Sequence, residues 1–490
     1  MTTHAPLNRP LGAIADDERA LRMIAALSAG GDARITLCPE MGLNKYLSAP
    51  HPREVLAYSS STVSDISAEA FAHLLALDEA GEDATYREQL TALSGRILAA
   101  YGIGHDAALV FAPSGTDLEY IALAAVHGRG EEGVHNILLG ADEIGSGCIH
   151  SAHGRYFARE TALIDDVAPA LDVPGFGAIS LVDIPVRCER GMACTSAEIS
   201  AAMAAEIAQA KVAGKHSLVH CVHGSKTGLV LPNRTDLMAL MMQFSGDATF
   251  VVDACQARIT SEAVAEYLDL GCIVLMTGSK FMGAPPFNGW ALLPKTMVAG
   301  ARALPSGFAS IFRRAEFPET WDGRDQLPES GNPSLVLRLT AAVFELERFQ
   351  QIAMIDIERM IEAFECALTR HVIEPLGASR VSPDKGAMAQ DCPIEMRTLA
   401  TLDVSGIAGL RTFEDAQRVH RVLALDGVRL GQPVKCVQLD EGWGGTLRIG
   451  LSMPQMSRWA GLDAGEMQAE LASDMARIAA ALQHSLTKMA

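Results

Sequence analysis

Five short, almost continuous apolar runs, separated by helical patterns, constrain the fold of this chain most strongly. The runs are AALVFA (107–112), HNILLG (135–140), HSLVHCV (216–222), TFVVDA (249–254) and CIVLMTG (272–278). Apolar runs of this length are typical of strands buried on both faces, as in a parallel sheet between two layers of helices. The alternation from about residue 65 onward therefore predicts an α/β fold with a mostly parallel sheet of about seven strands, covered by helices.

Helical patterns fill the gaps between these runs. TDLEYIALAAVHG begins at Thr116, and SAEISAAMAAEIAQAKVAG begins at Ser196, where the serine followed by Glu198 suits a helix start. After SGNPS (330–334), the pattern LVLRLTAAVFELERFQQIAMIDIERMIEAFECALTRHV is too long for one surface helix and predicts a bridge into a smaller α+β domain. We expect an N-terminal segment (1–64) that forms an arm across a dimer, a large domain (65–340) and a small C-terminal domain (341–490).

The composition limits the partners of the chain. Among 490 residues, 49% are hydrophobic and 20% are charged, which is enough to build large cores. A formal charge of -19 disfavours nucleic acid and anionic membranes and favours a small-molecule substrate. We also expect no transmembrane helix, no signal peptide and, because the ten cysteines form no CxxC pair, neither a zinc site nor a disulfide framework. These features predict a cytoplasmic protein.

Two ionisable residues follow apolar strands directly. Asp253 closes FVVD, where an isolated carboxylate would be costly without a cationic partner, and Lys280 follows LMTGS at the edge of the sheet where α/β proteins bind ligands. Either residue alone is more often a capping aspartate or a solvated turn lysine. Pyridoxal 5'-phosphate (PLP) would satisfy both, because its pyridinium nitrogen can donate to Asp253 and its aldehyde can condense with the Lys280 amine.

A third motif, LVFAPSGTDLEYIALAAV, supplies an anion site. A strand runs through Pro-Ser-Gly-Thr into a helix, so the amides of Gly115, Thr116 and Asp117 and the Thr116 hydroxyl converge on one spot. Free N–H groups and the positive end of a helix dipole favour phosphate there. An ordinary capped turn is an equal alternative for the motif alone, which matches neither GxxxxGK[ST] nor GxGxxG.

In their order along residues 100–450, these segments resemble the fold-type I PLP enzymes, and among them the class V aminotransferase and cysteine desulfurase superfamily. SGTDLE resembles the phosphate-binding loop, HGSKTGLVLP the N-E-x-G-x-x-x-P segment, DACQA the D-x-x-Q strand and GSKFMGAPP the Schiff-base turn. ESGNPS resembles the element that reaches the cofactor of the partner subunit, and GTLRIGLS the strand whose arginine holds the substrate carboxylate. The resemblance implies a homodimer with active sites at the interface.

The resemblance also implies a role for each matched residue. The catalytic residues would be Lys280, as Schiff-base lysine and general acid/base, and Asp253 at the ring nitrogen. The cofactor-binding residues would be Ser114, Gly115, Thr116, Ser225, Asp253, Gln256, Ser279, Lys280 and Asn332. Arg448 would bind the substrate carboxylate, for which its planar guanidinium is suited, although alone it could equally be a solvent-facing strand arginine.

Departures from the family pattern leave some roles open. ADEIGSGCIHSAHG replaces Glu-His-His, so the residue that stacks on the ring could be any of Glu143, Ile144, Ser146, His150 and His153. Ser225 replaces the asparagine of N-E-x-G, and Ser279 replaces the histidine that precedes the lysine in desulfurases. Cys436 and, more weakly, Cys392 are candidates for a sulfur-accepting nucleophile, but a cysteine without catalytic duty is the better interpretation of both.

The predicted function is that of a PLP enzyme acting on an α-amino acid through an external aldimine and a carbanion (quinonoid) at Cα, with transamination as the default outcome. A lyase that performs β-elimination, desulfuration, or retro-aldol or decarboxylative C–C chemistry would share all the residues named. An inactive scaffold of the same fold is disfavoured by the intact set of Lys280, Asp253 and Thr116. A nicotinamide-dependent dehydrogenase is disfavoured because no GxGxxG opens a βα unit.

Overall fold

The computed structural model describes residues 17–81, 84–104, 106–141, 143–145, 147–164, 166–381 and 393–489. The helices are α2 (Glu18–Leu27), α3 (Ala68–Ala80), α4 (Tyr86–Ala100), α5 (Leu118–Val126), α6 (Cys148–Ser151), α7 (Ser196–Val212), α8 (Arg234–Gln243), α9 (Ser261–Asp269), α10 (Lys295–Ala299), α11 (Pro333–Phe349), α12 (Met354–Leu368), α13 (Glu374–Leu376), α14 (Phe413–Leu425), α15 (Met453–Trp459) and α16 (Ala464–Met489). The strands are β1 (Leu56–Tyr58), β2 (Ala107–Ala112), β3 (Val134–Leu139), β4 (Ile179–Ile184), β5 (His216–His223), β6 (Val230–Leu231), β7 (Ala248–Asp253), β8 (Ile273–Thr277), β9 (Gly289–Pro294), β10 (Ser379–Arg380), β11 (Leu399–Asp403), β12 (Val428–Leu430), β13 (Gln438–Leu439), β14 (Gly442–Trp443) and β15 (Thr446–Gly450).

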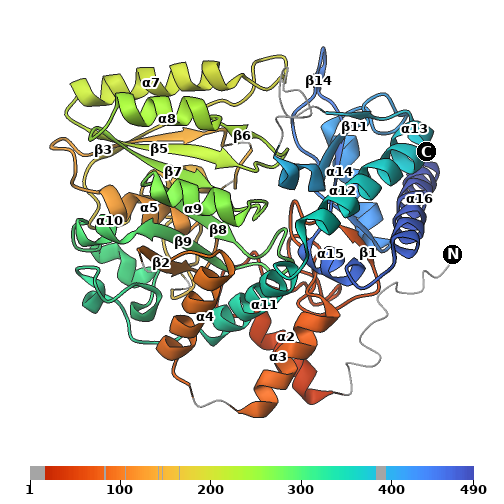
Figure 1. The fold of residues 1–490 in the computed structure, drawn as a ribbon, viewed down its shortest axis with the longest axis horizontal. Helices are drawn as coiled ribbons and strands as arrows, with labels where there is room; N and C mark the ends of the chain where they lie inside the picture. Colours follow the sequence, from red (N-terminus) through yellow and green to blue (C-terminus); the bar gives the residue numbers. More distant parts are fainter. Residues whose placement is uncertain are drawn as a thin grey trace.

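The largest sheet has the order β2-β9-β8-β7-β5-β3-β4, with the short β6 paired to β5 (Figure 1). The pairs β8–β7, β7–β5, β5–β3 and β3–β4 are parallel, whereas β9 is antiparallel to both of its neighbours. All five strands expected from apolar runs are present, with ends shifted by a residue or so. The mostly parallel α/β architecture is therefore confirmed, and β4 and β9 complete the sheet.

Alternate residues of the central strands face different helices, which explains their continuous apolar sequence. Leu218 of β5 and Val251 of β7 pack in the core that contains α5, whereas the next residues along, Val219 and Val252, pack in the core that contains α7 and α8. Because side chains alternate across a strand, burial on both faces requires an apolar residue at almost every position. The carboxyl ends of these strands border the site described below.

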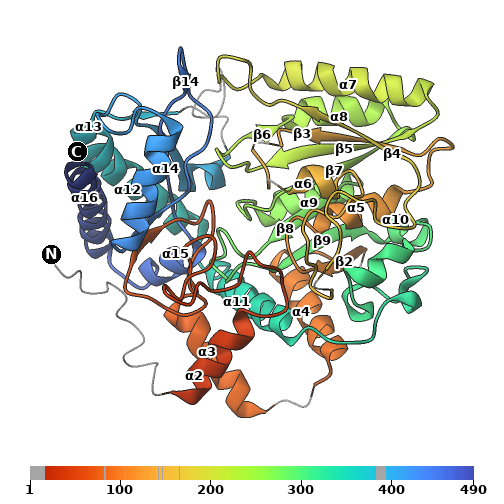
Figure 2. The same cartoon turned by 180° about the vertical axis from the view of Figure 1, so that it is seen from behind.

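The C-terminal part is built on the antiparallel sheet β10-β11-β15, with α12, α14 and α16 around it (Figures 1 and 2). The N-terminal segment joins this part, because β1 pairs in parallel with β12. The long helical pattern is divided into α11 and α12, with the break between Gln350 and Ala353. Helix α11 continues through residue 340, and the domain boundaries at 64/65 and 340/341 stay predictions.

Local capping explains where helices begin. Thr195, not Ser196, caps α7: its hydroxyl accepts from the Glu198 N–H, and the Glu198 carboxylate accepts from the Thr195 N–H, which forms a capping box.

Within the described part of the chain, no helix combines the length and apolarity that a membrane crossing would need.

Candidate active site

A cavity of about 370 Å³ lies at the carboxyl edge of the large sheet, a size that suits a small molecule. The carboxyl ends of five strands of this sheet and the loops that follow them supply Ser114, Gly115 and Thr116 (β2), Glu143, Ile144, Gly145, Gly147 and Cys148 (β3), Val222, Gly224, Ser225 and Lys226 (β5), Asp253, Cys255 and Gln256 (β7), and Thr277, Ser279 and Lys280 (β8). The rest of the wall comes from outside the sheet, namely Arg34, Lys45, Tyr46, Ser61, Thr62, Val63, Pro286, Phe287, Asn288, Gln432 and Arg448. The N-terminal segment thus lines the cavity of its own chain.

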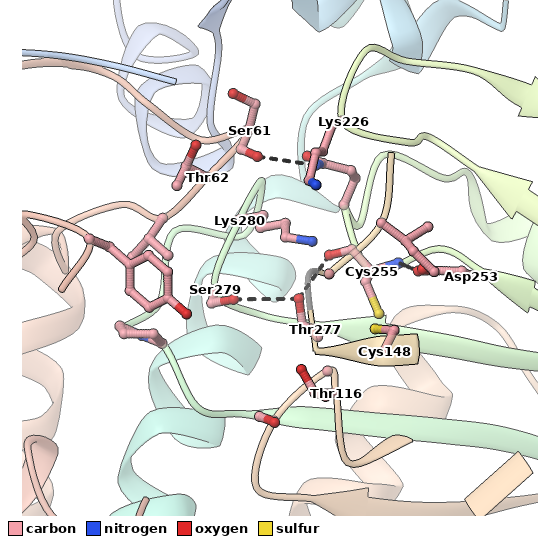
Figure 3. A pocket seen from close by; sticks show the side chains of 18 of the residues that line it. Ser61, Thr62, Thr116, Cys148, Lys226, Asp253, Cys255, Thr277, Ser279 and Lys280 are labelled. Carbon is pink, nitrogen blue, oxygen red and sulfur yellow. Dashed lines mark hydrogen bonds between the residues drawn. The ribbon is translucent and has the colours of Figure 1, made fainter. Parts of the chain in front are cut away.

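Asp253 and Lys280 border this one cavity, and both are partly buried. Asp253 is the last residue of β7, and its Oδ1 accepts the Cys255 N–H at 2.9 Å, which fixes the carboxylate at the rim. Figure 3 shows the Lys280 amine pointing into the space between Asp253 on one side and Ser61 and Thr62 on the other. The fold therefore brings together the two residues on which the PLP hypothesis depends.

The predicted phosphate cup lies at the start of α5, where Ser114, Gly115 and Thr116 line the cavity. A side chain at position 115 would place its Cβ 2.9 Å from the Thr277 side chain, so the turn needs glycine. Arg34 reaches this cup from the N-terminal segment and donates to Thr116 Oγ1 at 3.2 Å and Ser114 Oγ at 3.3 Å. The cup thus combines a helix N-terminus with a guanidinium, which suits an anion.

Three of the other expected cofactor residues line the cavity, and one does not. Gln256 is buried and fixed, accepting from Arg258 at 2.7 Å and donating to the Ser61 carbonyl at 3.2 Å. Ser279 lines the cavity beside Thr277, whereas the Ser225 hydroxyl donates to Glu143 at 2.7 Å. Asn332 lies away from the cavity, where it caps α11 and donates to the Gly30 carbonyl at 3.0 Å. Its expected role at the cofactor of a partner subunit stays a prediction.

The residues considered for ring stacking differ in their positions relative to the cavity. Glu143 forms a buried ion pair with Arg187 at 2.8 Å; burial alone would raise its pKa, but Arg187 and the Ser225 hydroxyl hold that pKa below its usual value. Glu143 is thus an anchor for the loop. His150 and His153 do not line the cavity, while Ile144 does, and Ser146 lies outside the described residues. Ile144 is accordingly the one of these described residues placed to contact a ring without being held in an ion pair.

Arg448, on β15, lines the cavity and is buried. Its guanidinium donates to the carbonyls of Gln432 at 2.6 Å, Lys226 at 3.0 Å and Ser61 at 3.2 Å, and to the Thr62 hydroxyl at 2.9 Å. Burial lowers its pKa to about 10, so it is still cationic at neutral pH. All four partners are neutral groups, so a substrate carboxylate would be the first anion to contact this guanidinium directly.

The sulfur-accepting role considered for Cys436 receives no support from its surroundings. Cys436 is 4% exposed and does not line the cavity, and burial raises the pKa of its thiol to about 12. The thiolate, which is the nucleophilic form, is therefore rare at neutral pH. Cys392 lies outside the described residues.

No family model matches the sequence, and no curated protein matches it. Solved structures match over most of their length. A NifS-like protein has 12% identity and a TM-score of 0.54, covering 86% of this chain and 99% of its own. A cysteine desulfurase from Escherichia coli has 14% identity and a TM-score of 0.54, covering 89% and 95%. A pyridoxamine-pyruvate aminotransferase from Mesorhizobium loti has 14% identity and a TM-score of 0.51, covering 89% and 98%.

The chain has the fold-type I architecture of PLP transferases. At these identities the likeness concerns the fold, which agrees with the resemblance seen in the motifs. In this fold the loops after the parallel strands are the ones that gather around the cavity, and the described chain places its Ser-Gly-Thr, Asp253 and Lys280 on three of them.

Two buried titratable residues next to the cavity lining were not singled out in the sequence. Glu119 and His220 lie beneath the cavity, 1% and 2% exposed, with Glu119 Oε2 3.5 Å from His220 Nδ1. Burial, and then the charge of Asp253, raise the pKa of Glu119 well above its usual value, while burial lowers the pKa of His220 to about 3. Burial thus disfavours the charged form of both side chains. In the sequence, this pair is visible only as single polar residues within otherwise apolar helix and strand patterns.

Two cysteines face the same end of the cavity. Cys148 and Cys255 line it beside Asp253 (Figure 3), and burial raises the pKa of both thiols well above the usual value. Cys255 is hydrogen-bonded to Asp253, and Cys148 to Glu119. We name Asp253, Glu119, His220, Cys148 and Cys255 the cavity floor; burial disfavours the charged forms of the last four.

Proposed function

We propose that this protein is a PLP-dependent enzyme that acts on an α-amino acid. One observation carries the proposal: Asp253, Lys280 and the Ser114–Thr116 cup line a single cavity of suitable size. These groups match the three reactive parts of PLP, since a carboxylate suits the ring nitrogen, an amine the aldehyde, and amides, hydroxyls and the Arg34 guanidinium the phosphate. Gln256, which lines the same cavity, would lie near the ring hydroxyl.

When bound, PLP would supply an electron sink that stabilises negative charge at the substrate Cα. Asp253 would keep the ring nitrogen protonated, because a carboxylate on a floor that is otherwise uncharged favours a cationic partner strongly. Lys280, once its amine is released by the incoming substrate, would hold and move a proton at Cα. Arg448 would bind the substrate carboxylate at the opposite, cationic side of the cavity.

Transamination is the reaction that we propose, because it needs a proton carrier and no further nucleophile. A desulfurase would need a reactive cysteine, and the cysteines near the cavity have thiols whose pKa is raised by burial: Cys148, Cys255 and Cys436. We also propose a cytoplasmic homodimer, on the strength of the motif resemblance, and light scattering of the purified protein would test the dimer.

The decisive experiment maps the lysine that binds the cofactor. The purified protein should absorb near about 420 nm, and borohydride should bleach this band and leave a modified peptide that contains Lys280. Lys280→Ala should lose the band and the adduct. Lys226→Ala is the matched control, since Lys226 lines the same cavity, and it should keep both. A colourless protein that binds NAD would refute the proposal, and an adduct on Lys226 would move the chemistry to that residue.

A panel of amino acids, each with and without a 2-oxo acid, tests the reaction type. Transamination yields the 2-oxo acid of the substrate only when the acceptor is present, while elimination or C–C cleavage releases product without it. Mass analysis of the products distinguishes these outcomes.

A further inference from the structure

The phosphate cup contains a buried carboxylate to which the proposed function gives no role. Asp117 directly follows Thr116, is the N-cap residue of α5 and is 5% exposed. Its Oδ2 accepts the Ser114 hydroxyl at 2.6 Å. A carboxylate thus contacts one of the two hydroxyls that would bind an anion, although like charges disfavour each other strongly in a buried site.

The charges around the cup do not favour an anion while Asp117 is ionised. The Arg34 guanidinium contacts the cup, but it is paired with the Asp32 carboxylate at 2.7 Å, which also accepts from Arg34 Nε. Arg34 and Asp32 together carry no net charge, so an ionised Asp117 makes the group negative. With a proton on Asp117 the group is neutral, and the free N–H groups at the start of α5 can then favour an anion.

The hydrogen bonds of Ser114 lead to the same conclusion. A hydroxyl has one proton to donate, and Ser114 donates it to Asp117. The Ser114 oxygen accepts from Arg34 at 3.3 Å and from the Asp117 N–H at 3.4 Å. Ser114 can therefore donate to a phosphate oxygen only after Asp117 gives up this bond. A protonated Asp117 does so, because its own O–H can donate to the Ser114 oxygen instead.

The surroundings of Asp117 place its titration close to neutral pH. Burial has the largest effect and raises the pKa of Asp117 to about 6. From the N-terminal segment, Arg34 lowers this pKa and Asp32 raises it. Tyr120, on α5, and Glu316, between α10 and α11, also interact with the Asp117 charge. A bound anion would raise the pKa of Asp117 further.

We propose that Asp117 takes up a proton from water when the phosphate of the cofactor binds, and that this proton frees the Ser114 hydroxyl to donate to the phosphate. Asp117 is thus a positioning residue, which acts on the anion through Ser114 and makes the affinity of the cup depend on pH. The inference rests on the proposed function for the identity of the anion, but the coupling depends only on Asp117, Ser114 and the Arg34–Asp32 pair.

Sulfate binding to the full-length protein, freed of any cofactor, tests the coupling. Sulfate is a suitable probe because it stays a dianion across the pH range, whereas phosphate itself titrates. We expect its affinity to fall at least about fivefold between about pH 6 and 8, since the bound state holds one proton more. Calorimetry at pH 7 in two buffers of different ionisation enthalpy should show an uptake of about half a proton or more per sulfate.

The variant D117N separates this coupling from a structural role. Its amide can donate to the Ser114 oxygen at every pH, as a protonated Asp117 would. At pH 8 the variant should therefore bind sulfate at least about fivefold more tightly than the unchanged protein, without proton uptake. D236N is the matched control, because Asp236 lies in the first turn of α8 and accepts a hydroxyl from Ser196. It should leave the pH dependence and the proton uptake unchanged.

Four results would overturn the inference: sulfate that does not bind even at pH 6, an affinity that does not change with pH, a D117N variant that binds sulfate no more tightly at pH 8, or a pH dependence that survives in D117N. In the last case the titrating group would be Glu316, whose pKa burial raises to about 7. The PLP proposal is tested separately, by the reducible adduct on Lys280. The adduct without the coupling would refute this inference alone, and the coupling without the adduct would refute the PLP proposal alone.

Discussion

The floor and the neck of the cavity differ in the burial and the charge of their side chains. The floor comes from strand ends and from α5, and Glu119, His220, Cys148 and Cys255 are at most 8% exposed there. Burial disfavours the charged form of each of these four groups. By the neck we mean the part of the cavity wall that Lys45, Lys226, Gln432 and Arg448 line, from the N-terminal segment, the β5–β6 loop and the C-terminal part of the chain. There Lys45 is exposed and Lys226 is half-buried, whereas Arg448 is buried.

This difference predicts that the floor acts mainly on the chemical step and the neck mainly on ligand binding. A charge held in a dry environment interacts strongly with a charge that forms beside it, so Asp253 can change the electronic state of a bound ring. At the neck, the exposed Lys45 is screened by solvent and salt, and the buried Arg448 is held by neutral oxygens, so these cations are suited to select and orient an anionic ligand. Substitutions on the floor should accordingly lower kcat, and substitutions at the neck should raise KM.

Asp253→Asn should have the largest effect, because it replaces the carboxylate that would face the ring nitrogen by an amide of nearly the same shape. We expect kcat to fall by about 100-fold or more, while KM changes by less than about threefold. Steady-state kinetics with saturating PLP would measure both. The control is Asp247→Asn, since Asp247 precedes the other end of the same strand and pairs with Lys211. Equal losses in the two variants would show that the floor charge has no special role.

Arg448→Lys should come next and should behave in the opposite way. A lysine keeps the positive charge but cannot replace the planar fork that contacts Ser61, Thr62 and Gln432. We expect KM to rise about tenfold, and kcat to change by less than about threefold. Arg458→Lys, in an exposed pair with Glu470, should change neither. A fall in kcat with an unchanged KM would place Arg448 with the floor instead.

The sequence predicted the floor chemistry better than the neck, for a physical reason. Asp253 and Lys280 each follow a continuous apolar run, and a charge beside a dry strand is visible in the sequence. The order of the parallel strands then forces these loops to one edge, so local patterns alone bring the two residues together. The fold class and five strands of the sheet were predictable for the same reason.

Arg448 was expected in the site from the motif resemblance, but its partners and the Glu119–His220 pair could not be predicted, because they depend on contacts between distant segments. Arg34 is 82 positions from Thr116, and Arg448 is 222 positions from Lys226, yet each pair is hydrogen-bonded. The hydrophobic periodicity within a segment of sequence does not indicate such contacts. Strand β9 was missed although it is apolar, since GWALLP follows a run of glycine and proline that resembles a loop.

Glu119→Gln should alter the pH dependence of stability. The raised pKa of Glu119 in the folded protein means that the folded state binds this proton more tightly than the unfolded state, whose carboxyl titrates near 4.5. Stability should therefore fall as pH rises above that value, by up to about 1.4 kcal/mol per pH unit until the folded pKa is passed. Glutamine does not titrate, so the variant should lose this slope and gain stability relative to the unchanged protein between pH 5 and 8.

Urea unfolding at several pH values, with the cofactor state held constant, would measure this effect. Glu189→Gln is the control, because Glu189 is exposed in a turn far from the floor in the fold. Parallel stability curves for the unchanged protein and Glu119→Gln would mean that Glu119 is ionised in the fold, and the floor would then carry two charges.

Cys436→Ser should have the smallest effect, and it tests whether the cations near the neck can activate a thiol. Burial raises the pKa of Cys436, and the nearby Arg187 and Arg448, which act in the opposite direction, leave it at about 12. We expect sulfide release from cysteine and transamination rates to change by less than about twofold, with no persulfide on this residue in mass spectra. The exposed Cys366 is the control, as Cys366→Ser. A loss of sulfide release in Cys436→Ser alone would mean that this thiol becomes accessible and ionised during turnover, and the neck would then take part in bond breaking as well as in binding.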